Sequence, residues 1–363
     1  MVGQTLALLL ARDRLRVALV TPEPAPQVKT DVRAYALNAA SRTLLESLRA
    51  WPDEAHATAV SSMEVHGDLD GSVHFDAASQ NAEALAWIVD VPALESRLAE
   101  AVRYQPHVER VPAPVPAALT AICEGRASRT RAEFGVEFQT TPYGQHAIAA
   151  RLDCEWPHGQ VARQWFHNDG ILAFLPLDGV AGCRVAIVWS VDQEQAPELL
   201  ALDAEAFALR VQEASHNALG QLQLSSERAA WPLQQAQANH WCGSLSTADA
   251  HSWVLLGDAA HNVHPLAGQG LNLGLADVQV LARILQARDD WRSVSDMRLL
   301  RRYERERKTT LLPMGMAMDG LQQLFARREA PIQALRNWGL KGFERSRLLK
   351  EWMARQAMGM SHP

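Results

Sequence analysis

The sequence predicts an α/β fold in two unlike parts, a layered part of helices and strands and a mostly antiparallel sheet, followed by C-terminal helices. A strand-like apolar run at 253–256 leads through a glycine-rich loop into a helical pattern that begins near Gly270, which is typical of an α/β unit. Strand-like runs at 146–152, 161–177 and 185–191 are broken by turn signals at 168–170 and 178–179. Such short runs between turns indicate antiparallel strands.

Length and composition describe an ordinary globular protein. The chain has 363 residues, 48% hydrophobic and 21% charged, which favours two domains. The net charge of −6 argues against nucleic acid as a partner. The four cysteines are spread out without a C-x-x-C motif, which indicates free thiols in a reducing compartment. No apolar run approaches the roughly 18 residues of a membrane span, so we expect a cytoplasmic protein.

The glycine-rich loop is the strongest motif in the chain. Gly268 and Gly270 leave bare backbone just before the helix. Free amides and the positive end of the helix dipole favour an anionic or electron-rich group at that point. Two alternatives remain: a simple strand-to-helix turn capped by Asp258, or a metal site on His261 and His264, which lacks the further ligands that metals need.

The order of residues from 257 to 274 resembles the second flavin-binding motif of the FAD-dependent aromatic hydroxylases, especially those of ubiquinone biosynthesis. The resemblance implies that Asp258 contacts the ribityl and pyrophosphate region of FAD. It also implies that the start of the helix faces the pyrimidine end of the flavin, where negative charge builds up on reduction. The residues expected to position the flavin are Pro265, Gly268 and Gly270. Further cofactor contacts are expected from Gly257, Gln269, Leu271 and Asn272.

The N-terminal segment resembles the end of a dinucleotide-binding G-x-G-x-x-G motif. Gly3 matches the third glycine, which lets the helix pack close to the sheet, while the first strand and two glycines are missing or lie outside the chain. The slot of the ribose-binding acid is Thr21, and Glu23 nearby is the candidate, with an exposed loop acid as the alternative. Residues 31–37 resemble the segment whose arginine reaches the flavin and pyrophosphate. Arg33 is the candidate for that role, and an exposed loop arginine is the alternative.

A third motif follows the strand-like run at 119–123. Residues 124–131 resemble the D-G-x-x-S-x-x-R fingerprint of the family, with Glu124 in place of Asp. The resemblance implies that Glu124, Gly125 and Arg131 serve the pyrophosphates of FAD and NAD(P)H. An ordinary strand-to-helix turn capped by Ser128 is the alternative.

The resemblance and the turn pattern together divide the chain into three parts. We expect a Rossmann-like FAD-binding domain (1–60, 90–135 and 240–298), an inserted β-sheet substrate domain (61–89 and 136–239) and a C-terminal helical region (299–363). A hairpin is predicted over 63–75, and Asp90 is predicted to cap a helix. Trp165, Phe174 and Trp189 either face a flat apolar substrate or pack in the core.

Two charged segments lie in the C-terminal region. The mixed charges of 301–308, at helical spacing, predict a solvated face. From 341 to 355, five basic residues outnumber two acids and are interleaved with apolar side chains. A basic amphipathic helix of this kind can lie on an anionic membrane surface. Peripheral contact with the inner membrane is therefore one hypothesis, and packing against the domain is the other.

The resemblance also implies an activity. An FAD- and NAD(P)H-dependent monooxygenase uses NAD(P)H to reduce FAD, adds O2 at flavin C4a, and hydroxylates a phenol ring through the hydroperoxide. The implied substrate is a hydrophobic, polyprenylated phenol of ubiquinone biosynthesis, and a complex of that pathway is an implied partner. Two hypotheses stay open beside it: a flavin-free accessory or lipid-binding member of such a complex, and a flavin hydroxylase or epoxidase of another substrate. No metal is implied, and no side chain is identified as the acid or base.

Overall fold

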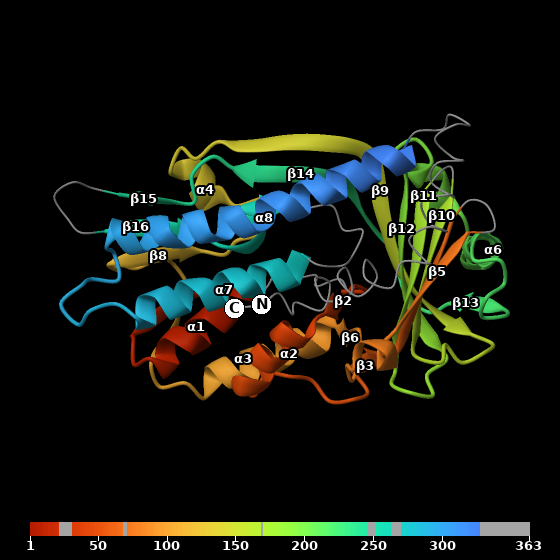
Figure 1. Ribbon diagram of the computed structural model, residues 1–363, viewed down its shortest axis with the longest axis horizontal. Helices are drawn as coiled ribbons and strands as arrows, with labels where there is room; N and C mark the ends of the chain where they lie inside the picture. The colour runs from red at the N-terminus through yellow and green to blue at the C-terminus, as the bar shows by residue number, and fades with distance from the viewer. Residues whose placement is uncertain (22–30, 68–70, 168–169, 246–250, 263–269, 327–363) are drawn as a thin grey trace.

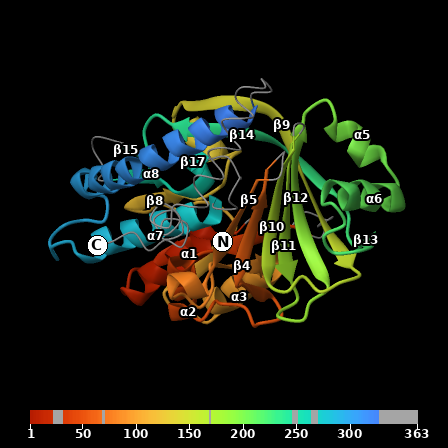
Figure 2. The same cartoon turned by 45° about the vertical axis from the view of Figure 1, so that its right-hand side comes forward.

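The computed structural model describes residues 1–21, 31–67, 71–167, 170–245, 251–262 and 270–326, with side chains in the last helix as far as Leu311. Helices and short parallel strand pairs form one side of the molecule, and a large sheet forms the other (Figure 1). The turned view shows most of the helices on one side of that sheet and the two helices at 196–201 and 204–214 on the other (Figure 2). This confirms the predicted α/β fold class with a second, mostly antiparallel sheet.

The helical side is built from three small sheets and the helices that cover them. The first sheet pairs β1 (Val17–Val20) with β7 (Val108–Val111) in parallel. The second joins β15 (Cys242–Ser244), β16 (Ser252–Leu255) and β8 (Leu119–Ile122), with β16 and β8 parallel. The third is antiparallel and has the order β2 (Ala34–Leu37), β6 (Ala86–Asp90) and β3 (Ala57–Val60). The helices are α1 (Val2–Arg12), α2 (Ala39–Ser47), α3 (Val91–Arg103), α4 (Arg129–Glu133), α7 (Gly270–Gln286) and α8 (Met297–Ala326).

One apolar core holds these elements together. Helix α7 packs against both α1 and α8, and its Leu275, Val278 and Leu281 are at most 1% exposed. These positions recur at helical spacing, so they form the stripe that the sequence pattern predicts. The capping prediction is confirmed as well, because the Asp90 side chain accepts a hydrogen bond from Ala93 N at the start of α3.

The large sheet has nine strands in the order β17-β14-β9-β12-β11-β10-β4-β5, with β13 paired to β9. Only the β10–β4 pair is parallel among these described strands. The strands are β4 (Ser62–His66), β5 (Ser72–Asp76), β9 (Phe138–Cys154), β10 (Val161–His167), β11 (Gly170–Leu177), β12 (Arg184–Asp192), β13 (Leu222–Leu224), β14 (Ala229–Ala238) and β17 (His261–Asn262). Helices α5 (Ala196–Ala201) and α6 (Ala204–Ala214) complete this side. The predicted hairpin is confirmed, with Met63 opposite Phe75. We keep the three-part division of the chain as a proposal.

The expectation for 301–308 is wrong in part. Tyr303 is fully buried and Arg307 is 4% exposed, because this part of α8 lies along α7 rather than in solvent. The charged segment at 341–355 lies outside the described residues. Within those that are described, no helix combines the length and the apolar character that crossing a membrane requires.

Candidate active site

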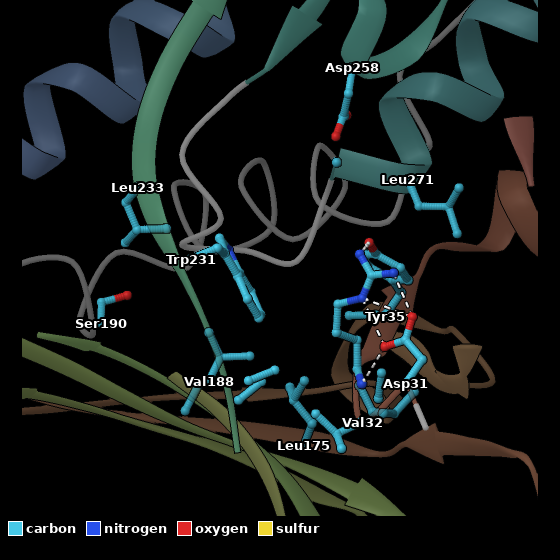
Figure 3. A pocket seen from close by; sticks show the side chains of 18 of the residues that line it. Asp31, Val32, Tyr35, Leu175, Val188, Ser190, Trp231, Leu233, Asp258 and Leu271 are labelled. Carbon is cyan, nitrogen blue, oxygen red and sulfur yellow. Dashed lines mark hydrogen bonds and ion pairs between the residues drawn. The ribbon is translucent and has the colours of Figure 1, made fainter. Parts of the chain in front are cut away.

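A cavity of about 870 Å³ lies between the helical side and the large sheet. Its upper end in Figure 3 is formed by Asp258 and by the start of α7 at Leu271. The loop that follows β8, from Glu124 to Ala127, also lines it. The sheet supplies the opposite wall with the apolar side chains of Leu175, Val188, Trp231 and Leu233 (Figure 3). The cavity is therefore polar at one end and apolar at the other.

Asp258 follows β16 in a short turn, the 3-10 helix η2 (Gly257–Ala259). Gly257 has φ of 59°, and a Cβ there would meet Val2 at 3.4 Å, so the turn needs a glycine. Burial raises the pKa of the Asp258 carboxyl, while the charges of His261, Arg126 and Arg33 oppose this shift. Asp258 lines the cavity, and no hydrogen bond joins its carboxylate to another described residue.

Helix α7 directs its N-terminus at the same end of the cavity. Gly270 and Leu271 line the cavity, and a Cβ on Gly270 would meet no atom within 4 Å. Asn272 acts differently, since its Oδ1 accepts from Asn38 N at 3.1 Å and from Ser41 Oγ at 2.7 Å, and its Nδ2 donates to Ala36 O at 2.8 Å. The side chain of Asn272 thus ties α7 to β2 and α2. Pro265, Gly268 and Gln269 lie outside the described residues.

Arg33 lines the cavity beside Asp31 and Tyr35. Its guanidinium donates to Asp31 Oδ2 at 2.5 Å and to Tyr35 Oη at 3.3 Å. Burial alone would raise the pKa of Asp31, but the hydrogen bonds and charge of Arg33, with a smaller effect of Arg151, lower it. Arg33 therefore stands on the cavity wall, held by an ion pair, rather than on an open loop surface.

Glu124 caps the short helix α4. Its carboxylate accepts from Ser128 Oγ at 2.7 Å, from Thr130 N at 3.1 Å and from Thr130 Oγ1 at 2.5 Å. These hydrogen bonds lower the pKa of Glu124 although burial opposes them. Ser128 caps the helix too, by accepting from Arg131 N. The capped-turn alternative thus describes the local geometry, while Glu124 and Gly125 also line the cavity.

Arg131 points into the protein rather than into the cavity. It is 7% exposed, donates to Ala259 O at 3.0 Å and to Arg126 O at 2.9 Å, and lies 3.5 Å from the centre of the Phe138 ring. Its guanidinium therefore joins the 124–131 loop to the Asp258 turn. Arg126 is the arginine of this loop that lines the cavity, and our sequence reasoning missed it although it directly follows Gly125.

Gly3 has a packing role where α1 meets the residue that follows β8. A Cβ there would come 3.2 Å from Cβ of Cys123, which directly follows β8, so glycine favours this close approach of α1. Met1 and Val2 line the cavity and Gly3 does not. Glu23 lies outside the described residues.

A buried ionic network supports the Asp258 turn from behind. Asp277 is 0% exposed and accepts from Gly257 N at 2.8 Å, from His261 Nε2 at 2.7 Å and from Arg307 Nε at 2.6 Å. Burial would raise the pKa of Asp277, but its interactions and hydrogen bonds with His261 and Arg307 lower it. The structure thus engages His261 in this network, and no group of three potential metal ligands occurs among the described residues. Our sequence reasoning missed Asp277 because an acid within a helix carries no local signal.

The three aromatic candidates are mainly core residues. Trp165 and Trp189 are 3% and 8% exposed and pack in the core of the sheet side. Phe174 meets Trp165 edge to face, with ring centres 4.8 Å apart, and is the one of the three that lines the cavity. Trp231, which we did not select, is the tryptophan on the cavity wall.

Comparison with known proteins identifies the cofactor. Residues 99–312 match the family model described as "FAD binding domain". The chain is 30% identical over 395 residues to 3-demethoxyubiquinol 3-hydroxylase of Escherichia coli, covering 99% of this chain and 96% of that protein. It is 35% identical over 246 residues to ubiquinone hydroxylase UbiL of Rhodospirillum rubrum, covering 68% of this chain and about half, 55%, of that protein.

Solved structures share the fold. PqsL, a probable FAD-dependent monooxygenase of Pseudomonas aeruginosa, has a TM-score of 0.72 at 23% identity, over 94% of this chain and 96% of PqsL. The p-nitrophenol 4-monooxygenase PnpA of Pseudomonas putida has a TM-score of 0.74 at 16% identity, over 98% of this chain and 95% of PnpA. With the family model and the E. coli relative, these results show that the chain is an FAD-dependent monooxygenase. It belongs to the FAD-dependent aromatic hydroxylase family, in the branch of the ubiquinone-biosynthesis hydroxylases.

Proposed function

We propose that the chain hydroxylates the ring of a hydrophobic phenol, specifically a polyprenylated phenol of ubiquinone biosynthesis, with NAD(P)H and O2 as co-substrates. The observation that carries this proposal is one cavity with a polar end at Asp258 and α7 and a mainly apolar wall on the sheet. A cavity of about 870 Å³ lies within the usual range of ligand sites. The names of the two ubiquinone-hydroxylase relatives support the choice of substrate.

At the polar end, the residues present fit FAD. The Asp258 carboxylate can accept hydrogen bonds from the hydroxyls of a ribityl chain, and Arg33 and Arg126 bring positive charge to the same wall for phosphate oxygens. The N-terminal amides of α7 at Gly270 and Leu271 suit the negative charge of a reduced flavin ring. When bound, FAD supplies the oxygen-activating chemistry. Pro265 and Gly268 stay predictions for flavin positioning, and Gln269 stays a prediction for cofactor contact.

At the apolar end, the sheet side chains bind and orient the substrate. Trp231, Leu233 and Val188 offer apolar surface to a ring and its hydrocarbon substituent, and Ser190 is a polar group on the same wall (Figure 3). Side chains of this kind exclude water and hold the reacting carbon in place. We assign no acid or base, because no described side chain on this wall has both the position and a shifted pKa that would mark one.

We also propose the setting in which the chain works. The basic segment at 341–355 would hold it at the inner membrane as a peripheral protein, where a polyprenylated substrate resides. A complex of ubiquinone-biosynthesis proteins is the proposed partner, in keeping with the pathway that the relatives' names indicate.

The test is to purify the protein and measure its flavin absorbance, then NAD(P)H oxidation with each class of phenol. We expect a polyprenylated phenol to stimulate oxidation and to yield a product heavier by one oxygen atom. Turnover of soluble phenols alone would favour the hypothesis of another substrate. Protein without flavin and without turnover would favour the flavin-free accessory hypothesis.

A further inference from the structure

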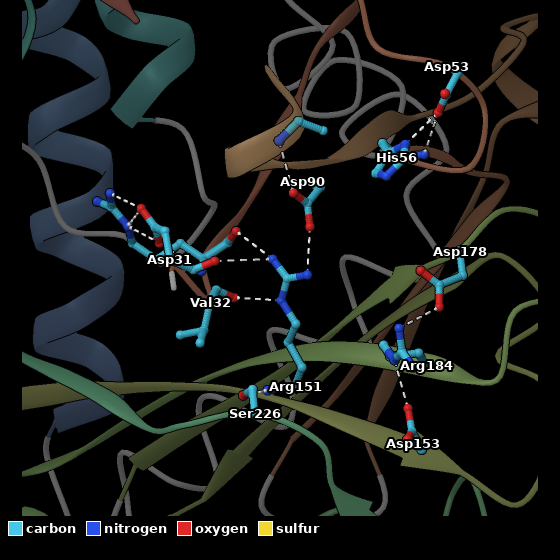
Figure 4. Close-up of polar contacts among 12 residues, drawn as sticks. Asp31, Val32, Asp53, His56, Asp90, Arg151, Asp153, Asp178, Arg184 and Ser226 are labelled. Carbon is cyan, nitrogen blue, oxygen red and sulfur yellow. Dashed lines mark hydrogen bonds and ion pairs between the residues drawn. The ribbon is translucent and has the colours of Figure 1, made fainter. Parts of the chain in front are cut away.

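Arg151 bridges the large sheet and the helical side. It lies on β9, two residues after Ala149, which lines the cavity, so both side chains point to the same face of the sheet. The guanidinium donates from Nε to Val32 O at 3.2 Å, and from one terminal nitrogen to Asp31 O at 3.4 Å and Arg33 O at 3.5 Å. Its other terminal nitrogen lies 2.6 Å from Asp90 Oδ2. Figure 4 shows these contacts converging on one side chain.

The segment that Arg151 holds, residues 31–33, is supported by the burial of Val32, which is 4% exposed, and by few other backbone hydrogen bonds among the described residues. It ends just before β2 begins at Ala34, so its backbone takes no part in the described sheets. Arg33 O accepts one further hydrogen bond, from Val91 N at 3.4 Å. Yet this segment forms the cavity wall that carries Asp31 and Arg33. The hydrogen bonds from Arg151 to its three carbonyl groups therefore tie this wall to the large sheet.

Asp90 links Arg151 to the start of α3. Its Oδ1 caps α3 by accepting from Ala93 N at 3.1 Å, while Oδ2 pairs with Arg151. The Asp90 and Arg151 side chains are only 14% and 20% exposed, so water screens the pair weakly. A planar guanidinium can bind a carboxylate and several carbonyls together, and the single ammonium of lysine cannot reproduce that fork.

We infer that Arg151 is a positioning residue that fixes the 31–33 segment against the substrate sheet and so holds Arg33 at the cofactor end of the cavity. Arg151 does not line the cavity, so it acts through Arg33. This inference goes beyond the proposed function, and it rests on that function only for the role of Arg33 toward FAD.

The test uses the full-length protein with Arg151→Met, Arg151→Lys and Asp90→Asn. Arg184→Met is the matched control, since Arg184 on β12 pairs with Asp153 at 2.7 Å and Asp178 at 3.2 Å and does not line the cavity. Figure 4 shows both arginines. Hydrogen exchange of the apo protein reports on residues 31–37, and fluorescence titration gives the dissociation constant for FAD.

We expect Arg151→Met to speed exchange over 31–37 and to weaken FAD binding about tenfold, the scale expected when bound carbonyls lose their donor. Arg151→Lys keeps the charge near Asp90 but loses the planar guanidinium with its several donors, so it should also speed hydrogen exchange over 31–37. Asp90→Asn keeps an oxygen for the cap and should have a smaller effect. Arg184→Met should leave both readouts at wild-type values.

Unchanged exchange over 31–37 in both Arg151 variants would overturn the inference. So would an equal increase in Arg184→Met, because that would show general loosening. If Arg151→Met does not fold, the comparison of Arg151→Lys with Arg184→Met decides in the same way. The exchange readout needs no flavin or substrate, so it separates failure of this inference from failure of the proposed function.

Discussion

Replacing Asp277 by Asn removes the charge that anchors the turn behind Asp258. The carboxylate is 0% exposed and pairs with His261 and Arg307 at 2.7 and 2.6 Å. Removing one partner of a buried ion pair leaves the other charge uncompensated and costs about 3–5 kcal/mol. Folded domains are stable by only about 5–15 kcal/mol. Asp277→Asn should therefore remove a large share of the free energy of unfolding.

Urea unfolding of the apo protein measures this loss. With a slope of about 3 kcal/mol/M, the expected change moves the midpoint down by about 1 M or more. The control is Arg283→Met, on the same helix, whose ion pair with Glu306 is exposed and so contributes about 0–1 kcal/mol. The double variant Asp277→Asn/Arg307→Met should recover part of the loss, since it leaves no lone buried charge at Arg307. A midpoint for Asp277→Asn no lower than that of Arg283→Met would refute this reasoning.

The pH dependence of unfolding tests the same contribution of Asp277 to stability. The pKa of Asp277 is lowered in the folded protein, so its stabilising contribution is present above the unfolded value of about 3.9 and is lost as pH falls through the lower folded value. The difference in stability between wild type and Asp277→Asn should therefore persist at neutral pH and shrink only below about pH 4. A difference that disappears already near neutral pH would contradict this assignment.

Four further predictions concern the cavity and the turn that carries Asp258. Asp258→Ala should weaken FAD binding by about ten- to a hundredfold, the range for hydrogen bonds to a charged group, as measured by fluorescence titration. Burial raises the pKa of Asp258. The affinity of the wild type for FAD should therefore begin to fall on acidification at a pH above the ordinary Asp value of about 3.9. Asp258→Asn should lack this pH dependence, and equal pH profiles of the two proteins would contradict the prediction. Gly257→Ala places a Cβ 3.4 Å from Val2 at φ of 59° and should destabilise by about 1–2 kcal/mol, seen as a lower melting temperature. Trp231→Ala should raise KM for hydrophobic phenols more than kcat falls, and an unchanged KM would show that Trp231 does not contact the substrate.

Much of the local structure could be predicted because its signals lie within a few residues. Asp90 and the Ala93 amide that it caps are three residues apart, and the hairpin joining Met63 to Phe75 follows from strand alternation. The strand, loop and helix around Gly257 and Gly270 likewise follow from apolar spacing and glycines. Those neighbours determine backbone conformation directly, so no knowledge of the rest of the chain is needed.

The orientation of side chains could not be predicted in the same way. Within one loop, Arg131 turns inward to Ala259 O while Arg126 faces the cavity, and nothing in their spacing distinguishes them. Trp165 and Trp189 enter the core and Trp231 the cavity wall, although all three lie on strands. Which face of a strand is buried depends on what packs against it.

The sequence by itself determined the family, the cofactor and the order of elements, because the glycine-rich motif and the strand and helix periods are local patterns. Only the tertiary structure decided what holds the site in place. Arg151 binds carbonyls 118 to 120 residues away, and Asp277 pairs with Arg307, 30 residues further on. Such partners meet only after the chain has folded. The sequence shows that a charged residue lies in a strand or helix, but it does not show whether the side chain faces water or a buried ion.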